Sequence, residues 1–70
     1  MEFSQTTYVD NPHWNQIVFT TKSGNTRVEI GSFDKDGEVE FFVTELGEST
    51  TFFLTRENVQ QLFNHLKDQL

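Results

Sequence analysis

The spacing of apolar residues changes once along this chain, at Thr55, and this change constrains the fold more than any other feature. Before Thr55, apolar side chains recur at every second residue, as in β-strands with one buried face. After it they follow a helical period and form one stripe, at Val59, Leu62, Phe63, Leu66 and Leu70. The pattern predicts an α+β domain in which an antiparallel sheet is followed by one C-terminal amphipathic helix over residues 55–70.

The start of the predicted helix carries the usual signals. Thr55 is a good N-cap, and Glu57 lies in the first turn, where a negative charge suits the helix dipole. Asn58 stands where a full capping box has Glu or Gln, so we expect only half of that box. Lys67 lies near the other end, where a cation is favoured.

Residues 14–54 predict an antiparallel meander of three to four strands. Trp14 opens the first run, and turn signals separate the runs at Ser23-Gly24-Asn25, Asp36-Gly37 and Gly47-Glu48. Residues 1–13 are less regular: Phe3, Tyr8 and Val9 form either an irregular arm or a short edge strand that ends at Asp10-Asn11-Pro12.

Seventy residues make one small domain, spanning residues 1–70, and a domain of this size is marginally stable alone. The chain has no cysteine, which excludes disulfides and a cysteine-based zinc site. A core rich in phenylalanine (eight residues) and a partner chain are the remaining sources of stability.

One helix covers only one face of a sheet. We expect the covered face to hold Val28, Ile30, Val39, Phe41, Val43, Phe52 and Leu54, with Leu62, Phe63 and Leu66 of the helix docked against it. The opposite face keeps Phe42 and Phe53 and, on the same alternation, Val18. Exposed aromatic residues of this kind mark an interface, so we expect a homodimer formed through either the helix stripe or Phe42 and Phe53. The alternative is that Phe3, Tyr8 or Trp14 folds over these two rings.

Negative charge is concentrated in one part of the chain. The formal net charge is −6, and residues 29–48 carry all of that excess, with seven acidic residues against Lys35 alone. The acidic residues, which we take as candidates for partner binding, are Glu29, Asp34, Asp36, Glu38, Glu40, Glu45 and Glu48. Along a strand, Glu38 and Glu40 lie roughly 6.6 Å apart on one face, a spacing similar to that of successive phosphates. The acidic segment is either a solubilising surface or a face that binds a basic protein.

The sequence contains no motif that predicts a catalytic or metal site. Asp34-Lys35-Asp36-Gly37 resembles part of a calcium loop, but the first and last loop positions are then Ser32 and Val43, which cannot serve. His13 and His65 lie on different predicted elements, and Asp10 near His13 is better explained by a turn than by a catalytic pair. We predict a protein that is not an enzyme, with no metal and no cofactor. The lack of a long apolar run or signal peptide predicts a cytoplasmic protein with no membrane partner.

Two resemblances bear on function. The segment "FFLTRENVQQLFNHLKDQL", with the strand before it, resembles the end of the single-stranded-DNA-binding transcriptional coactivator family over about residues 38–70. That family implies a dimerisation helix and basic strands, whereas Glu29, Glu38 and Glu40 occupy the polar strand positions here. Chain size, absence of cysteine and the segment "EIGSFDKDGEVEFFVTE" resemble the small acidic DNA mimics with which bacteriophages inhibit host DNA-binding proteins.

Together these features favour a non-catalytic acidic binding protein. Its expected partner is a basic host DNA-binding protein, such as a nucleoid-associated or repair protein, whose DNA-binding surface it occupies without itself binding nucleic acid. If phage-encoded, it acts in the host bacterial cytoplasm. The alternative is a coactivator-like dimer that binds single-stranded nucleic acid and stacks bases on Tyr8, Trp14, Phe33 or Phe42.

Overall fold

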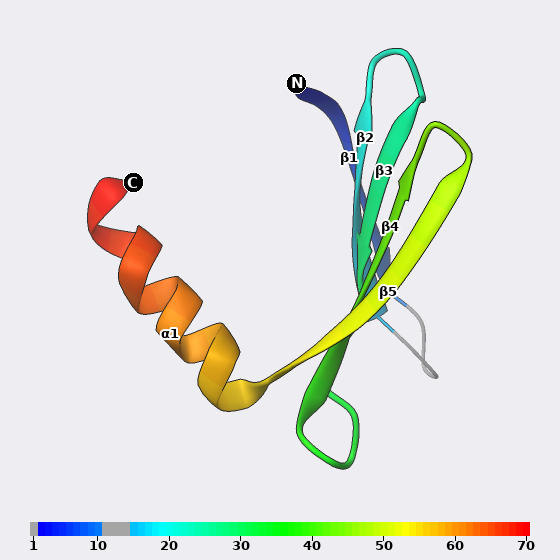
Figure 1. The fold of residues 1–70 in the computed structure, drawn as a ribbon. Coiled ribbons are helices and arrows are strands. Elements are labelled where there is room, and N and C mark those ends of the chain that lie inside the picture. The colour runs from blue at the N-terminus through cyan, green and yellow to red at the C-terminus, as the bar shows by residue number, and fades with distance from the viewer. Residues whose placement is uncertain (1, 11–14) are drawn as a thin grey trace.

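A five-stranded antiparallel sheet followed by one helix makes up the protein (Figure 1). The computed structural model describes residues 2–10 and 15–70. Its elements are β1 (Phe3–Asp10), β2 (Asn15–Thr21), β3 (Thr26–Ile30), β4 (Glu38–Glu45), β5 (Glu48–Thr55), α1 (Arg56–Leu66) and a 3₁₀ turn η1 (Lys67–Gln69). The strands pair in sequence order, so the sheet is a simple meander and the fold is α+β, as predicted.

The sheet has one more strand than the three to four predicted. The segment expected as an irregular arm or short edge strand is β1, eight residues long, which pairs with β2 from Phe3↔Thr21 to Asp10↔Asn15. Residues 3–8 of this edge strand are exposed, and its sequence, FSQTTYVD, has few apolar residues, which weakens the alternation signal. His13 and Trp14 lie outside the described residues, so the expectations placed on them are not tested.

Tight turns join the strands at or next to the predicted positions. Between β4 and β5, Leu46 and Gly47 both have positive φ, 51° and 83°, as a two-residue hairpin turn with the twist of the strands requires. In the β3–β4 loop, Gly37 has φ 77°, a conformation that glycine adopts without steric cost. The third turn therefore lies one residue earlier than the predicted Gly47-Glu48, and Glu48 opens β5.

The pairing register gives the sheet two chemically different faces. One row across all five strands consists of Tyr8, Ile17, Ile30, Phe41 and Phe52, all apolar or aromatic. We call this side the apolar face; its residues are Phe3, Tyr8, Ile17, Phe19, Val28, Ile30, Val39, Phe41, Val43, Phe52 and Leu54. On this face the rings of Phe41 and Phe52 stack with their centres 5.1 Å apart. Every residue that the sequence predicted for this face lies on it.

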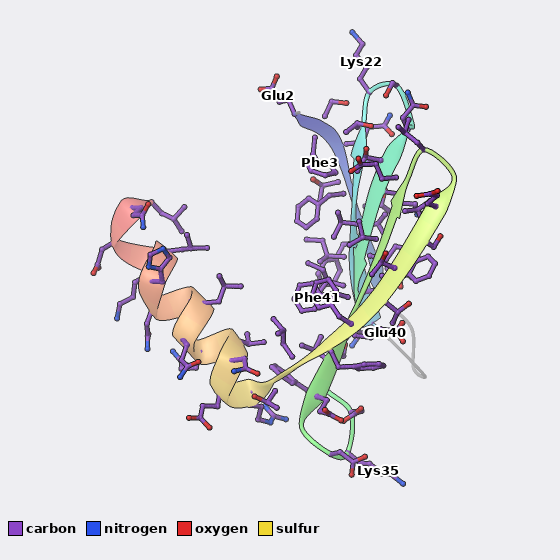
Figure 2. All side chains as sticks on the ribbon, viewed as in Figure 1. Glu2, Phe3, Lys22, Lys35, Glu40 and Phe41 are labelled. Atoms are coloured by element: carbon purple, nitrogen blue, oxygen red, sulfur yellow. The ribbon has the colours of Figure 1, made fainter. Side chains whose placement is uncertain are left out.

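The other side, which we call the acidic face, carries Glu29, Glu38 and Glu40 together with Val18, Phe42 and Phe53. In Figure 2, Phe3 and Phe41 point to the side on which α1 lies, whereas Glu40 points to the opposite side. Phe42 and Phe53 therefore lie on the face where the sequence placed them.

The expectation that α1 covers the apolar face is wrong within a single chain. No residue of α1 is buried, and Leu62, Phe63 and Leu66 are 44%, 56% and 42% exposed. The reason lies at the junction: β5 ends at Thr55 and α1 begins at Arg56, with no loop between them. A strand and the helix that folds back on its sheet are usually joined by 2–6 residues, so α1 instead leaves the end of the sheet and stands apart from it (Figure 1).

Four contacts hold this junction. The Thr55 hydroxyl accepts the Asn58 N–H at 3.1 Å and the Asn58 amide oxygen accepts the Thr55 N–H at 3.4 Å, so the capping box is complete rather than half present. The Arg56 N–H donates to the Gly37 carbonyl at 3.0 Å, and the Arg56 guanidinium lies 4.4 Å from the centre of the Phe33 ring. The first turn of α1 is thereby attached to the β3–β4 loop.

The resulting core is small. Among the described hydrophobic residues, only Val18 and Val39 are buried, one on each face of the sheet. Phe52 on the apolar face remains 42% exposed and Tyr8 72% exposed. Apart from its first turn, the described helix contributes almost nothing to the burial of apolar surface.

Removing the N-cap should weaken the helix without unfolding the sheet. We expect Thr55→Ala to lower the free energy of unfolding by about 1 kcal/mol, because it leaves the Asn58 N–H without its acceptor. Thr51→Ala, the same chemical change in the middle of β5, should leave the helical signal unchanged. Far-UV circular dichroism with urea denaturation measures both effects, and equal helical signals in the two variants would contradict the role of the cap.

Candidate protein-binding surface

The seven acidic residues singled out in the sequence lie in three separate places. Glu29, Glu38 and Glu40 are on the acidic face, and Asp34 and Asp36 are in the β3–β4 loop at one end of it. Glu45 and Glu48, in contrast, pair with each other at the β4–β5 hairpin. From Glu38 to Glu45 the strand advances by seven residues, about 24 Å. The seven residues therefore do not form one continuous row.

On the acidic face, carboxylates and aromatic rings alternate. Glu40 is directly opposite Phe53, and Phe42 follows two residues along β4, directly opposite Glu29. Cross-strand neighbours of this kind have Cβ atoms about 5 Å apart. The residues expected to bind a partner and those expected to mediate self-association thus share one surface, and a dimer formed through Phe42 and Phe53 would cover Glu29 and Glu40.

A groove of ≈ 390 Å³, which we call the acidic groove, opens at the loop end of this face. Its lining includes the carboxylates of Asp34, Glu38 and Glu40, the rings of Phe33 and Phe53, and the neighbouring residues Asn15, Gln16, Gly31 and Ser32. Glu40 and Phe53 are exposed and Glu38 is half-buried. Carboxylates beside aromatic rings are the surroundings that lysine and arginine side chains prefer.

Basic side chains of the protein leave most of this charge uncompensated. Among the described residues, the ion pair within 4 Å joins Arg27 Nε to Glu29 Oε2 at 3.4 Å, along β3. This exposed pair contributes little to stability, but it partly neutralises Glu29. Glu38 and Glu40 have no such partner in the described part of the chain, so they carry the charge that is open to a partner protein.

The two loop aspartates differ in role. Asp34 Oδ1 accepts the backbone N–H groups of Asp36 at 2.9 Å and of Glu38 at 3.0 Å, and the Asp34 N–H donates to the Glu38 carbonyl. Asp34 therefore organises the turn that leads into β4, as an aspartate at a turn commonly does. Asp36 is exposed on the loop.

Glu45 and Glu48 line a different hollow, of ≈ 430 Å³, with Val43, Leu46 and Thr50. It lies at the opposite end of β4 and β5 from the acidic groove. Leu46 is 74% exposed there.

Other kinds of site are not found in the described residues. No group of three or more potential metal-ligating side chains comes together in residues 2–10 and 15–70. His65 is exposed on α1, and its carbonyl accepts the side-chain amide of Gln69. No helix in this part of the chain is long and apolar enough to cross a bilayer.

Comparison with family models, curated proteins and solved structures yields no match to this chain. The surface must therefore be interpreted from its own chemistry. Sequence reasoning found the carboxylates and the rings but not the contact between Arg56 and Phe33, because nothing in the sequence brings residues 33 and 56 together before the sheet register is known. It also missed that the apolar face lies open, although the direct passage from Leu54 through Thr55 to the helix was a signal for this.

Replacing the two loop aspartates should separate their roles. We expect Asp34→Ala to lower the free energy of unfolding by about 1–2 kcal/mol, because two backbone N–H groups lose a charged acceptor. Asp36→Ala removes the same charge two residues further along the loop. We expect it to change the free energy of unfolding by less than about 0.5 kcal/mol. Urea denaturation of both variants measures the difference; equal effects would mean that the Asp34 hydrogen bonds do not stabilise the loop.

Proposed function

We propose that this protein is a non-catalytic binding module whose acidic face binds the nucleic-acid-binding surface of a basic protein and thereby displaces the nucleic acid. The observation that carries the proposal is the surface built by Glu38, Glu40 and Phe53 at the acidic groove. Its partner would supply lysine and arginine side chains.

Charge supports this assignment. Glu38 and Glu40 lie two residues apart on β4 and so project to the same side at roughly 6.6 Å. Counterion release drives basic grooves onto rows of phosphates, and a row of carboxylates at similar spacing competes for the same cationic side chains. It also repels nucleic acid from this face, which separates a competitor from a nucleic-acid binder.

Rigidity supports it as well. Both carboxylates lie on β4, a strand paired on both sides, by β3 and β5. A partner that binds them does not have to order the backbone first, and this lowers the entropic cost of association relative to a flexible acidic tail. The rings of Phe33 and Phe53 add apolar contact for the stems of the partner's basic side chains.

One observation favours the second candidate, a coactivator-like dimer that binds single-stranded nucleic acid. A sheet followed by a helix with an uncovered apolar stripe is the layout that this resemblance implies. Against it, Glu29, Glu38 and Glu40 occupy the polar strand positions where a phosphate-binding sheet requires lysine or arginine.

The test is a displacement titration in which this protein competes with labelled duplex DNA for basic nucleoid and repair proteins at near-physiological salt. We expect displacement by the unmodified protein and a loss of roughly tenfold or more in potency for Glu38→Lys/Glu40→Lys, mainly through slower association. Displacement should also weaken as the salt concentration rises.

The matched control is Glu45→Lys/Glu48→Lys. It changes the net charge by the same amount, but at the β4–β5 hairpin, where Glu45 lies about 17 Å along β4 from Glu40 and about 24 Å from Glu38. We expect it to retain most of the potency. Equal losses in the two double variants would show that only net charge matters, and tight binding of single- or double-stranded DNA by the protein alone would favour the second candidate instead.

A further inference from the structure

We propose that two copies of this chain form a dimer by exchanging helices, so that α1 of each copy lies on the apolar face of the other. This inference is independent of what the acidic face binds. It rests on the surface that a single chain leaves exposed and on the geometry of the strand-to-helix junction.

A single chain exposes more surface than a folded monomer of its mass. Its accessible surface is 5631 Å², whereas a compact monomer of 8.2 kDa exposes about 4,500 Å². The excess of about 1,100 Å² is somewhat more than the roughly 800 Å² that each partner buries in a standard protein interface. The radius of gyration, 13.1 Å against about 11 Å for a compact chain of 70 residues, shows the same expansion.

The exposed surface consists of two parts that fit each other chemically. One is the stripe on α1, where Leu62, Phe63 and Leu66 are all more than 40% exposed. The other is the apolar face, whose central row contains no charged residue from Tyr8 to Phe52. Each chain exposes one helix stripe and one apolar face. In a two-fold dimer, the stripe of each copy can be buried on the apolar face of the other.

The junction between β5 and α1 favours exchange of the helix between two copies. Arg56 follows the last residue of β5 directly, its N–H is bonded to the Gly37 carbonyl, and its guanidinium lies over Phe33. For α1 to lie against its own sheet, it would have to swing toward the sheet about Thr55, where no loop is present and these contacts hold its first turn (Figure 1). The same helix can reach the sheet of a second copy without any change at the junction.

Exchange through the apolar face also leaves the acidic face free. Phe42, Phe53 and Glu40 lie on the opposite side of the sheet, where such a dimer does not cover them. The dimer therefore presents two acidic faces, one from each copy, which a dimer formed through Phe42 and Phe53 could not do.

The first test is the mass in solution. We expect the mass of two chains in light scattering at micromolar concentration. Phe63→Glu should raise the dissociation constant of the dimer roughly thirtyfold or more, because it places a charge in the centre of the interface. Gln61→Glu, which adds the same charge on the side of α1 away from the stripe, should leave the dissociation constant unchanged.

The second test locates the contact, with each chain carrying a single cysteine at one chosen position. The chain has no cysteine, so a thiol cross-linker can react only at the cysteine that is introduced. When chains with Phe63→Cys are mixed with chains carrying Phe52→Cys, a short thiol cross-linker should join them. Phe53→Cys, the adjacent residue on the acidic face and similarly exposed, should not react with the helix.

Three results would overturn the inference. A protein that stays monomeric at micromolar concentration has no exchanged helix. A dimer that cross-links through Phe53 and not through Phe52 uses the acidic face instead. In a chain carrying both Phe63→Cys and Phe52→Cys, cross-linking between these two positions at high dilution would show that the helix folds back on its own sheet.

Discussion

The passage from β5 into α1 without a loop is the constraint on which the rest of the structure depends. Thr55 ends the strand and caps the helix, and Arg56 is bonded to the β3–β4 loop through its N–H and lies over Phe33 through its guanidinium. With no loop after β5 and with these contacts at its first turn, the helix stands apart from the sheet (Figure 1). The apolar surfaces of both elements remain exposed, and the two buried valines in residues 2–10 and 15–70 add little stability to a chain of this size.

The two faces of the sheet differ in their chemistry. The apolar face, with the stacked rings of Phe41 and Phe52, is chemically suited to bury a helix. The acidic face combines Glu38 and Glu40 with Phe53 around a groove and is suited to basic side chains. Strand alternation makes this division possible, since adjacent residues of β4 point to opposite sides. The proposed helix exchange and the proposed binding of a basic partner therefore use different faces of the sheet.

Much of the fold was predictable from local patterns. The alternation of Val39, Phe41 and Val43, the turn at Gly47 and the helical stripe after Thr55 each depend on interactions within a few residues, and the structure confirms them. Strand β1 was underestimated because its polar, threonine-rich sequence carries little hydrophobic alternation. The completed capping box was missed because an asparagine amide oxygen can replace the usual glutamate.

For the candidate site, the sequence by itself determined the residues and their sides of the strand. It placed Glu38 and Glu40 together and Phe42 and Phe53 on the face opposite Phe41, because side-chain direction in a strand follows position alone. Only the tertiary structure decided which of the seven acidic residues are neighbours, and whether the helix covers its own sheet. Both depend on pairing register and on the direction of the chain at Thr55, which arise from contacts between residues far apart in the sequence, such as Phe33 with Arg56 and Glu40 with Phe53.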